Sequence, residues 1–323
     1  MKKRLPVRRS GLARWSRRVG AVGVPLILVA VGAHRIGAID PEAMGWSLLL
    51  AVVLGALAVL FAFVASVMLW RRGGAGASDA LRGFVYGTLA LGPAIAAAVA
   101  LVLYPPLNDV STDLDDPPAL SGPVRPAAAA AGDRRALQAE AYPDIVPRRF
   151  RMEPGQLHAA VRKVVDKRGW AVAFELPPDM PDAGTRLQVV VRTPVLALTD
   201  DVAIRIRPDR FGALLDIRSA SRLGSHDLGA NATRIRTFFR DLDEALLESY
   251  GDLARLTVTE EEVAEAAARP VEELPLLTER PLGSDDGRVP LPTVKPFLGG
   301  EFGDDMPAEL EEIFQDDAPD LEG

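Results

Sequence analysis

Residues 200–239 read DDVAIRIRPDRFGALLDIRSASRLGSHDLGANATRIRTFF, and this stretch decides the fold of the soluble part of the chain. Apolar and polar residues alternate over 201–207 and again over 213–221, which is the pattern of half-buried strands. Pro208 and Asp209 interrupt the alternation. The two runs are therefore predicted to be neighbouring strands joined by a short turn.

A long helix is predicted to follow the second strand. Ser225 or Asp227 can cap its N-terminus, because both side chains accept hydrogen bonds from helical N–H groups. Apolar residues then recur with helical spacing. They predict a buried face made of Ile235, Phe238, Phe239, Leu242 and Leu246.

The same kinds of pattern extend upstream to residue 148. Strands are predicted over Arg148–Met152, Trp170–Leu176 and Arg186–Thr193, and a helix begins at Pro154 and ends at Gly169. Residues 148–256 are therefore predicted to form a soluble α+β domain with the order β-α-β-β-β-β-α. Short turns between consecutive strands favour a mainly antiparallel sheet with both helices on one face.

Strand alternation assigns the side chains of the sheet to two faces. The apolar residues of the two central strands are predicted to face the helices: Val202, Ile204, Ile206, Ala213, Leu215 and Ile217. The opposite face is predicted to be uncovered and to carry Arg192, Arg205, Arg207 and Arg218. Planar guanidinium groups suit phosphate and carboxylate, so this face is a candidate anion site. The alternative is a solvated face on which arginines pair with Asp201 and Asp216.

The turn 219–231 is a second candidate site. It brings Arg222 and Ser225 towards the N-terminus of the last helix, whose free N–H groups and dipole favour an anion. The alternative gives Asn231 a structural role, in which its side chain ties the turn back by hydrogen bonds. Arg222, Ser225 and Asn231 complete the predicted ligand-binding set.

Three apolar runs occupy residues 19–104. Spans are predicted at about 19–38, 46–70 and 83–104, and the second run contains no charged residue. Gly83 and Gly87 show a small-xxx-small spacing that can pack helices. In a span this rich in Ala and Gly, we attribute that spacing to chance.

The placement of Lys and Arg predicts an orientation. Residues 1–18 are strongly basic and carry no acid, and Arg71, Arg72 and Arg82 lie around the turn after the second run. The positive-inside rule puts both in the cytoplasm and the C-terminal domain outside it. Cleavage of the first run as a signal peptide is the alternative, and it leaves this orientation unchanged.

Residues 105–147 are rich in Pro, Ala and Asp and are predicted to be a linker lying over a surface. Within this segment, 108–118 (NDVSTDLDDPP) is predicted to be a turn-rich docking segment. The alternative is a calcium site, because calcium prefers carboxylate oxygens, although the spacing does not match an EF-hand.

Residues 257–323 are predicted to be an acidic, largely disordered tail. Thr259–Glu262 has the pattern of a capping box for a short helix that ends near Arg269. A second helix, formed when a partner binds, would use Met306, Leu310, Ile313 and Phe314. The alternative for both is a solubilising tail.

Composition excludes several kinds of chemistry. The chain has no cysteine, so disulfides, thiolate zinc sites and cysteine nucleophiles are excluded, and with three histidines we predict no metal and no cofactor. Ser225, His226 and Asp227 are adjacent and cannot form a hydrolase triad. No catalytic residue is predicted, and a hydrolase using Asp200, Asp201 or His226 is the least favoured alternative. The basic patches lack interleaved aromatic residues, so nucleic acid is not an expected partner.

Four stretches carry a family resemblance: YPPLNDVSTDLDDPP at 104–118, AYPDIVP at 141–147, TDDVAIRIRP at 199–208 and DIRSASRLGSHDLGANATRIRTFF at 216–239. With the preceding spans, the chain resembles over about 20–250 the bacterial family known as domain of unknown function 1499. The resemblance implies a membrane-anchored protein with this soluble domain, and it implies no activity or catalytic residue.

We therefore expect a multi-pass protein of the bacterial inner membrane that is not an enzyme. Its extracytoplasmic domain is expected to bind an anionic small molecule, a lipid headgroup or an envelope protein. A structural or assembly scaffold of the cell envelope is the alternative. Besides the lipid bilayer, no other partner is expected.

Overall fold

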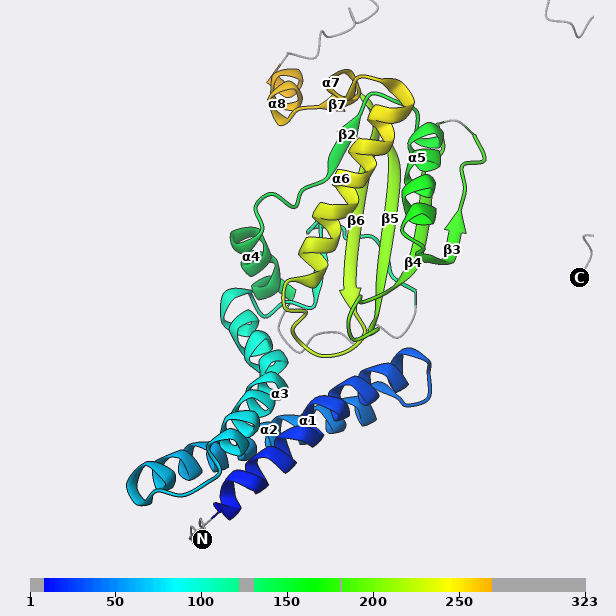
Figure 1. Cartoon of the computed structure of the whole chain (residues 1–323). Coiled ribbons are helices and arrows are strands. Elements are labelled where there is room, and N and C mark those ends of the chain that lie inside the picture. Colours follow the sequence, from blue (N-terminus) through cyan, green and yellow to red (C-terminus); the bar gives the residue numbers. More distant parts are fainter. Residues whose placement is uncertain (1–8, 122–130, 181, 269–323) are drawn as a thin grey trace, which may run out of the picture. The chain divides into compact units, whose positions relative to one another are not determined.

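The computed structural model describes residues 9–121, 131–180 and 182–268. Three long helices come first in this part of the chain, and a sheet flanked by helices follows (Figure 1). The predicted combination of three apolar helices with a downstream antiparallel sheet and helices is confirmed.

The three apolar helices are α1 (Gly11–Arg35), α2 (Pro41–Arg72) and α3 (Ala77–Leu103), and each is long and apolar enough to cross a membrane. α1 begins well before residue 19, because the side chain of Ser10 caps it and accepts a hydrogen bond from Ala13 N at 3.3 Å. α2 begins after Asp40, whose carboxylate accepts from Ala43 N at 2.6 Å.

Small residues form the contacts among these three helices. A Cβ atom on Gly83 would lie 1.7 Å from Ser16 Oγ, and one on Gly87 would lie 2.8 Å from the carbonyl oxygen of Gly55. The interpretation of the Gly83/Gly87 spacing as chance is therefore wrong. Glycine at both positions allows α3 to approach α1 and α2 at backbone distance.

The soluble part forms one antiparallel sheet with helices. Its strands in chain order are β1 (Asp109–Ser111), β2 (Arg148–Phe150), β3 (Ala171–Leu176), β4 (Thr185–Arg192), β5 (Thr199–Asp209), β6 (Gly212–Ser221) and β7 (Thr257–Val258). They lie in the order β3-β4-β5-β6-β2-β7, and β1 pairs separately with β6. Helices α5 (Pro154–Lys167) and α6 (Ala230–Tyr250) cover one face of the sheet (Figure 1).

The hydrophobic core lies between the sheet and these two helices. Val202, Ile204 and Ile206 of β5 are buried there against Ile235 and Phe238 of α6. Each such side chain contributes about 1.5–3 kcal/mol when fully buried. The pairing of β5 with β6 places Arg205 opposite Asp216 and Ala203 opposite Arg218. The predicted division of side chains between two faces is therefore confirmed.

Residues 105–147 are more than a linker, which corrects the prediction made from composition. They contain β1 and the helix α4 (Ala131–Ala141). Buried Gln138 of α4 bonds both backbone groups of Ser111, donating to O at 2.6 Å and accepting from N at 3.1 Å. Proline and aspartate are frequent here because the segment turns repeatedly while it follows the sheet.

The described chain ends with α7 (Leu253–Leu256), β7 and α8 (Glu260–Ala268). The predicted capping box is confirmed: Thr259 N donates to Glu262 Oε2 at 3.0 Å, and Glu262 N donates to Thr259 Oγ1 at 3.3 Å. The predictions for the tail from residue 269, including the helix at Met306–Phe314, lie outside the described residues.

Candidate anion-binding site

The arginine face of the sheet is covered by residues 108–121, which we call the acidic strap. The strap starts in β1 on the edge of β6, where Thr112 N donates to Ile217 O at 2.9 Å. It ends over β4, where Ser121 and Gln188 exchange two hydrogen bonds of 2.8 and 2.7 Å. The prediction of an uncovered face is therefore wrong, and the prediction of a docking segment at 108–118 describes the observed arrangement.

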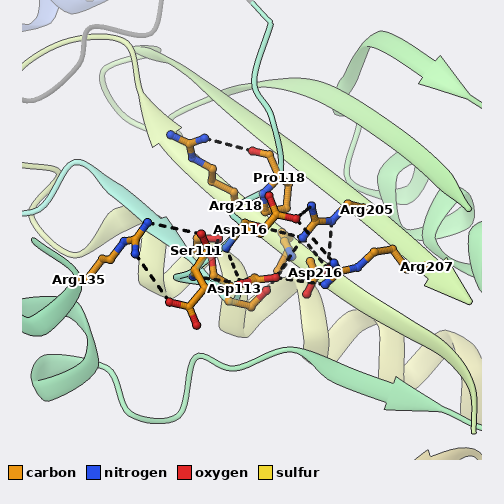
Figure 2. Close-up of polar contacts among 12 residues, drawn as sticks. Ser111, Asp113, Asp116, Pro118, Arg135, Arg205, Arg207, Asp216 and Arg218 are labelled. Carbon is orange, nitrogen blue, oxygen red and sulfur yellow. Dashed lines mark hydrogen bonds and ion pairs between the residues drawn. The ribbon is translucent and has the colours of Figure 1, made fainter. Parts of the chain in front are cut away.

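Arg205 is the centre of the contact between strap and sheet (Figure 2). Its guanidinium donates to Asp116 Oδ2 at 2.8 Å, to Asp113 Oδ2 at 3.1 Å and to Asp216 Oδ2 at 3.2 Å. The side chain of Arg205 is only 9% exposed. Three carboxylates therefore surround one buried cation, two of them from the strap and one from β6.

Arg207 extends this cluster along β5. Its Nη2 lies 3.1 Å from Asp113 Oδ2 and 2.9 Å from Asp216 Oδ2. Burial raises the pKa of Asp216 above its ordinary value, although Arg207 and Arg205 both lower it. Burial also raises the pKa of Asp113, but hydrogen bonds from the Asp116 and Asp115 N–H groups and the two arginines outweigh it, so the net shift is downward.

The remaining arginines of the predicted set are paired in the same way, except Arg192. Arg218 forms a two-pronged contact with Asp109 of the strap at 2.9 and 2.6 Å. Arg222 forms another with Asp201 at 2.7 Å on both prongs. These hydrogen bonds raise the pKa of Arg218 and of Arg222. The alternative pairing of arginines with Asp201 and Asp216 is thus observed.

The turn 219–231 binds an anion that belongs to the chain itself. The carboxylate of Asp227 accepts from Gly229 N at 2.9 Å and from Asn231 N at 2.7 Å, at the start of α6. Asn231 is fully buried and donates to Asn108 O at 3.0 Å, which is the tie-back role predicted as the alternative. Ser225 is exposed, and the structure does not bring it to the other predicted site residues.

The three residues considered for hydrolysis also have hydrogen-bond or ion-pair partners. Asp200 pairs with Arg234 of α6, Asp201 pairs with Arg222, and His226 Nδ1 accepts from Leu228 N at 2.9 Å. Within residues 9–121, 131–180 and 182–268, no three His, Cys, Asp or Glu side chains are grouped as metal ligands. The calcium interpretation of 108–118 is therefore not supported, because arginines hold these carboxylates.

Arg192 differs from the rest of the predicted set. It lies on the arginine face by strand parity, but it is opposite Thr199 at the end of β4. A strand rises about 3.3 Å per residue, which puts Arg192 roughly 20 Å from Arg186, the residue opposite Arg205. Arg192 is exposed, and its guanidinium has no hydrogen bond or ion pair with any other residue that the structure describes.

Arg192 lines an open cavity of about 820 Å³, which we call the Arg192 pocket. The pocket lies between the end of β4, the start of β3 and the first turns of α6. Its wall is formed by Arg168, Gly169, Trp170, Ala171, Val190, Val191, Arg192, Thr193, Pro194, Leu228, Gly229, Ala230, Thr233, Arg234 and Thr237. These lining residues include three arginines and no carboxylate, so the pocket favours an anion.

Sequence reasoning missed most of this pocket. Arg168 and Trp170 follow the end of α5, and Arg234 lies on α6 beside the predicted apolar stripe. The pattern of apolar and polar residues in each segment cannot predict a shared cavity, because the cavity forms where three separate segments meet. The acids of the strap gave no direct signal of pairing, because they lie far from the arginine stripe along the chain.

Residues 109–242 match the family model described as Protein of unknown function (DUF1499), and this part of the chain belongs to that family. The match begins at β1 and ends in α6, so it includes the strap and excludes the three apolar helices. No curated protein and no solved structure matches the chain.

Proposed function

We propose that this chain is a membrane-anchored binding module whose sheet domain takes an anionic ligand in the Arg192 pocket, outside the cytoplasm. The observation that supports binding is a cavity whose wall includes Arg192, which has no partner among the described residues, and contains no carboxylate. Cavities of a few hundred to about 1,000 Å³ are the usual size for small-molecule sites.

The other arginines of the predicted set support a structural role instead. Arg205, Arg207 and Arg218 bind the strap, and Arg222 binds Asp201. A free anion at these positions would have to displace a carboxylate that is covalently part of the domain. We therefore assign the binding function to Arg192 and the holding of the strap to Arg205, Arg207 and Arg218.

Full-length protein in nanodiscs, analysed by native mass spectrometry, tests this proposal. The wild type should carry an additional anionic mass, and Arg192→Glu should lose it. Arg186→Glu is the matched control, because Arg186 is an exposed arginine of the same strand and does not line the pocket. A bare wild-type mass, or an added mass unaffected by Arg192→Glu, contradicts the proposal.

The proposed orientation is supported by contacts at one end of the helices. Ser10 N donates to Ala75 O at 3.0 Å, and Arg17 pairs with Asp79 at 2.9 Å. The basic start of α1 and the turn that follows Arg71 and Arg72 of α2 thus lie at the same end. The positive-inside rule favours the cytoplasm for that end, in a bacterial inner membrane.

Cysteine labelling tests the orientation cleanly, because the chain has no cysteine of its own. Ser225→Cys in the exposed turn should react with a membrane-impermeant maleimide in intact spheroplasts. Ser78→Cys, at the exposed start of α3, should react only after lysis. The reverse pattern would place the sheet domain in the cytoplasm.

A scaffold role is the second candidate, and the edge strand β3 favours it. Val172, Phe174 and Leu176 are exposed on a strand whose one partner among the described strands is β4. An apolar edge with free backbone groups is suited to a protein partner. Crosslinking from Phe174 replaced by a photoreactive residue should capture an envelope protein if this role holds, and should capture none if it does not.

A further inference from the structure

We infer that the Arg192 pocket takes an anionic amphiphile, with its charged head at Arg192 and its hydrocarbon part along the apolar residues of the wall. This inference rests on the proposed binding function and names the class of ligand. Three features of the pocket carry it: the chemistry of its wall, the number of free charges and the fixed position of its aromatic side.

About half of the wall is apolar. Seven of the lining residues are apolar: Trp170, Ala171, Val190, Val191, Pro194, Leu228 and Ala230. The three threonines add little polarity, because their hydroxyls are already used. Thr233 Oγ1 donates to Gly229 O at 2.9 Å, Thr237 Oγ1 donates to Thr233 O at 2.6 Å, and Thr193 Oγ1 accepts from Leu198 N at 3.0 Å.

Leu228 is held in the pocket wall against its conformational preference. Its φ of 55° lies in the left-handed region, which costs a residue with a Cβ about 1 kcal/mol or more. Its side chain is nevertheless 38% exposed. Leu228 therefore adds an exposed apolar residue to the pocket wall at a cost in backbone strain.

The charge of the pocket matches one negative group. Arg234 pairs with Asp200, and Arg168 pairs with Asp241 at 2.5 Å and donates to Thr237 O at 3.0 Å. Of the three arginines in the wall, Arg192 alone has no partner among the described residues. A ligand with one acidic head therefore neutralises the unpaired charge of the pocket. A small, highly charged anion would leave the apolar residues of the wall exposed to water.

The aromatic side of the pocket is preorganised. The Trp170 ring stacks on buried Phe238 with centroids 6.1 Å apart, and the Arg168 guanidinium lies 5.3 Å from the Trp170 ring centroid. Because these contacts fix the ring, little side-chain entropy is lost when a ligand contacts it. Trp170 also provides a reporter inside the proposed site.

The test uses full-length protein in phosphatidylcholine nanodiscs and the fluorescence of Trp170. The chain has four tryptophans, so the variant Trp15→Phe/Trp46→Phe/Trp70→Phe retains Trp170 alone. The probes are the ω-bromo derivatives of butyrate, octanoate and dodecanoate, whose bromine quenches tryptophan at contact, together with neutral ω-bromododecanol. Calorimetric titration of the wild type with the three acids guards against a folding defect in the triple variant.

The acids should quench Trp170 saturably, and their affinity should rise about fourfold for each methylene that the wall covers. Arg192→Glu should weaken dodecanoate at least about tenfold, while Arg186→Glu should leave it unchanged. The neutral alcohol should bind at least about tenfold more weakly than the acid. Nanodiscs that contain brominated phosphatidylglycerol form a separate arm: quenching there identifies a membrane lipid as the source, and quenching by the added acid alone identifies a free fatty acid.

Three results would overturn the inference. If affinity depends on Arg192 but is the same for butyrate and dodecanoate, the ligand is a small anion, and the proposed function survives without this class of ligand. If acid and alcohol quench equally and Arg192→Glu changes neither, the pocket is only an apolar groove. If inorganic phosphate is titrated in the same way and neither it nor any of the acids binds in an Arg192-dependent way, the proposed function fails with the inference.

Discussion

Arginines of one sheet are in opposite circumstances at the strap contact and at the Arg192 pocket. At the strap, each arginine meets a carboxylate of the chain, and Arg205 meets three. At the pocket, Arg192 meets none from the described part of the chain. An arginine stripe is therefore available to a separate anion only where the chain leaves a guanidinium unpaired.

The largest expected effect is on stability, from Arg205→Glu. Reversing this charge leaves Asp113, Asp116 and Asp216 with Arg207 as their one shared cation among the described residues and adds a fourth carboxylate. Removing one partner of a buried ion pair costs about 3–5 kcal/mol, and we expect a loss of that size in the free energy of unfolding. Denaturant unfolding of the sheet domain in full-length protein measures it.

Arg186→Glu is the control for that measurement. Arg186 lies directly opposite Arg205 on β4, and it is exposed. We expect its reversal to change the free energy of unfolding by less than about 0.5 kcal/mol. Equal losses in the two variants would show that the face responds to charge in general and that the strap contact has no special role.

The next effect is expected from Asn231→Ala, which breaks the tie between α6 and the strap. The Asn231 amide is fully buried, donates to Asn108 O and Ser221 Oγ, and accepts from Ser219 Oγ at 2.7 Å. Leaving these groups unpaired should cost about 2 kcal/mol of unfolding free energy. Ser225→Ala in the same turn is the control, since that exposed side chain should tolerate the change.

A smaller effect is expected at acid pH. The pKa of Asp113 is below its ordinary value of 3.8 in the folded protein, so its contribution to stability is present above about pH 4 and is lost as the pH falls. Asp216 has the opposite sign, because its raised pKa means that protonation favours the folded state. Asp113→Asn should therefore remove about 1 kcal/mol of the stability that the wild type loses between neutral and acid pH.

Thermal unfolding at a series of pH values measures this difference. The variant should retain some acid sensitivity, because hydrogen bonds from Arg236 lower the pKa of Asp144 as well. Parallel pH profiles for wild type and Asp113→Asn would mean that Asp113 is not ionised in the strap contact.

The smallest stability effect is expected from Arg192→Glu. Since Arg192 has no partner in the described structure, its reversal should change the free energy of unfolding by less than about 0.5 kcal/mol. The same variant should lose the anionic ligand, which separates binding from folding. A destabilisation comparable with that of Arg205→Glu would place Arg192 among the structural arginines.

The alternation of apolar and polar residues and the positions of turn residues predicted the sheet domain well, for a physical reason. Val202, Ile204 and Ile206 alternate with polar residues because one face of β5 packs against helices, and that local rule is visible in the sequence. The strap was predicted only as a docking segment. Its position depends on pairs such as Asp109 with Arg218, which lie far apart along the chain.

The pocket was beyond prediction for a related reason. Trp170, Arg192 and Leu228 come from three elements, and their convergence depends on where β3 starts and β4 ends. The packing of Gly83 against Ser16 was missed similarly, because glycine is common in apolar spans whether or not a helix approaches. In both cases the deciding contact is tertiary.

The claim that the strap supplies the anions for the arginine face can be tested with a double-mutant cycle on Asp109 and Arg218. The two side chains are joined at 2.6 Å and are about equally shielded, with 22% and 21% exposed. Unfolding of wild type, Asp109→Asn, Arg218→Gln and the double variant gives their coupling energy. We predict about 1 kcal/mol or more. A coupling energy of zero, with the two losses simply additive, would contradict the claim.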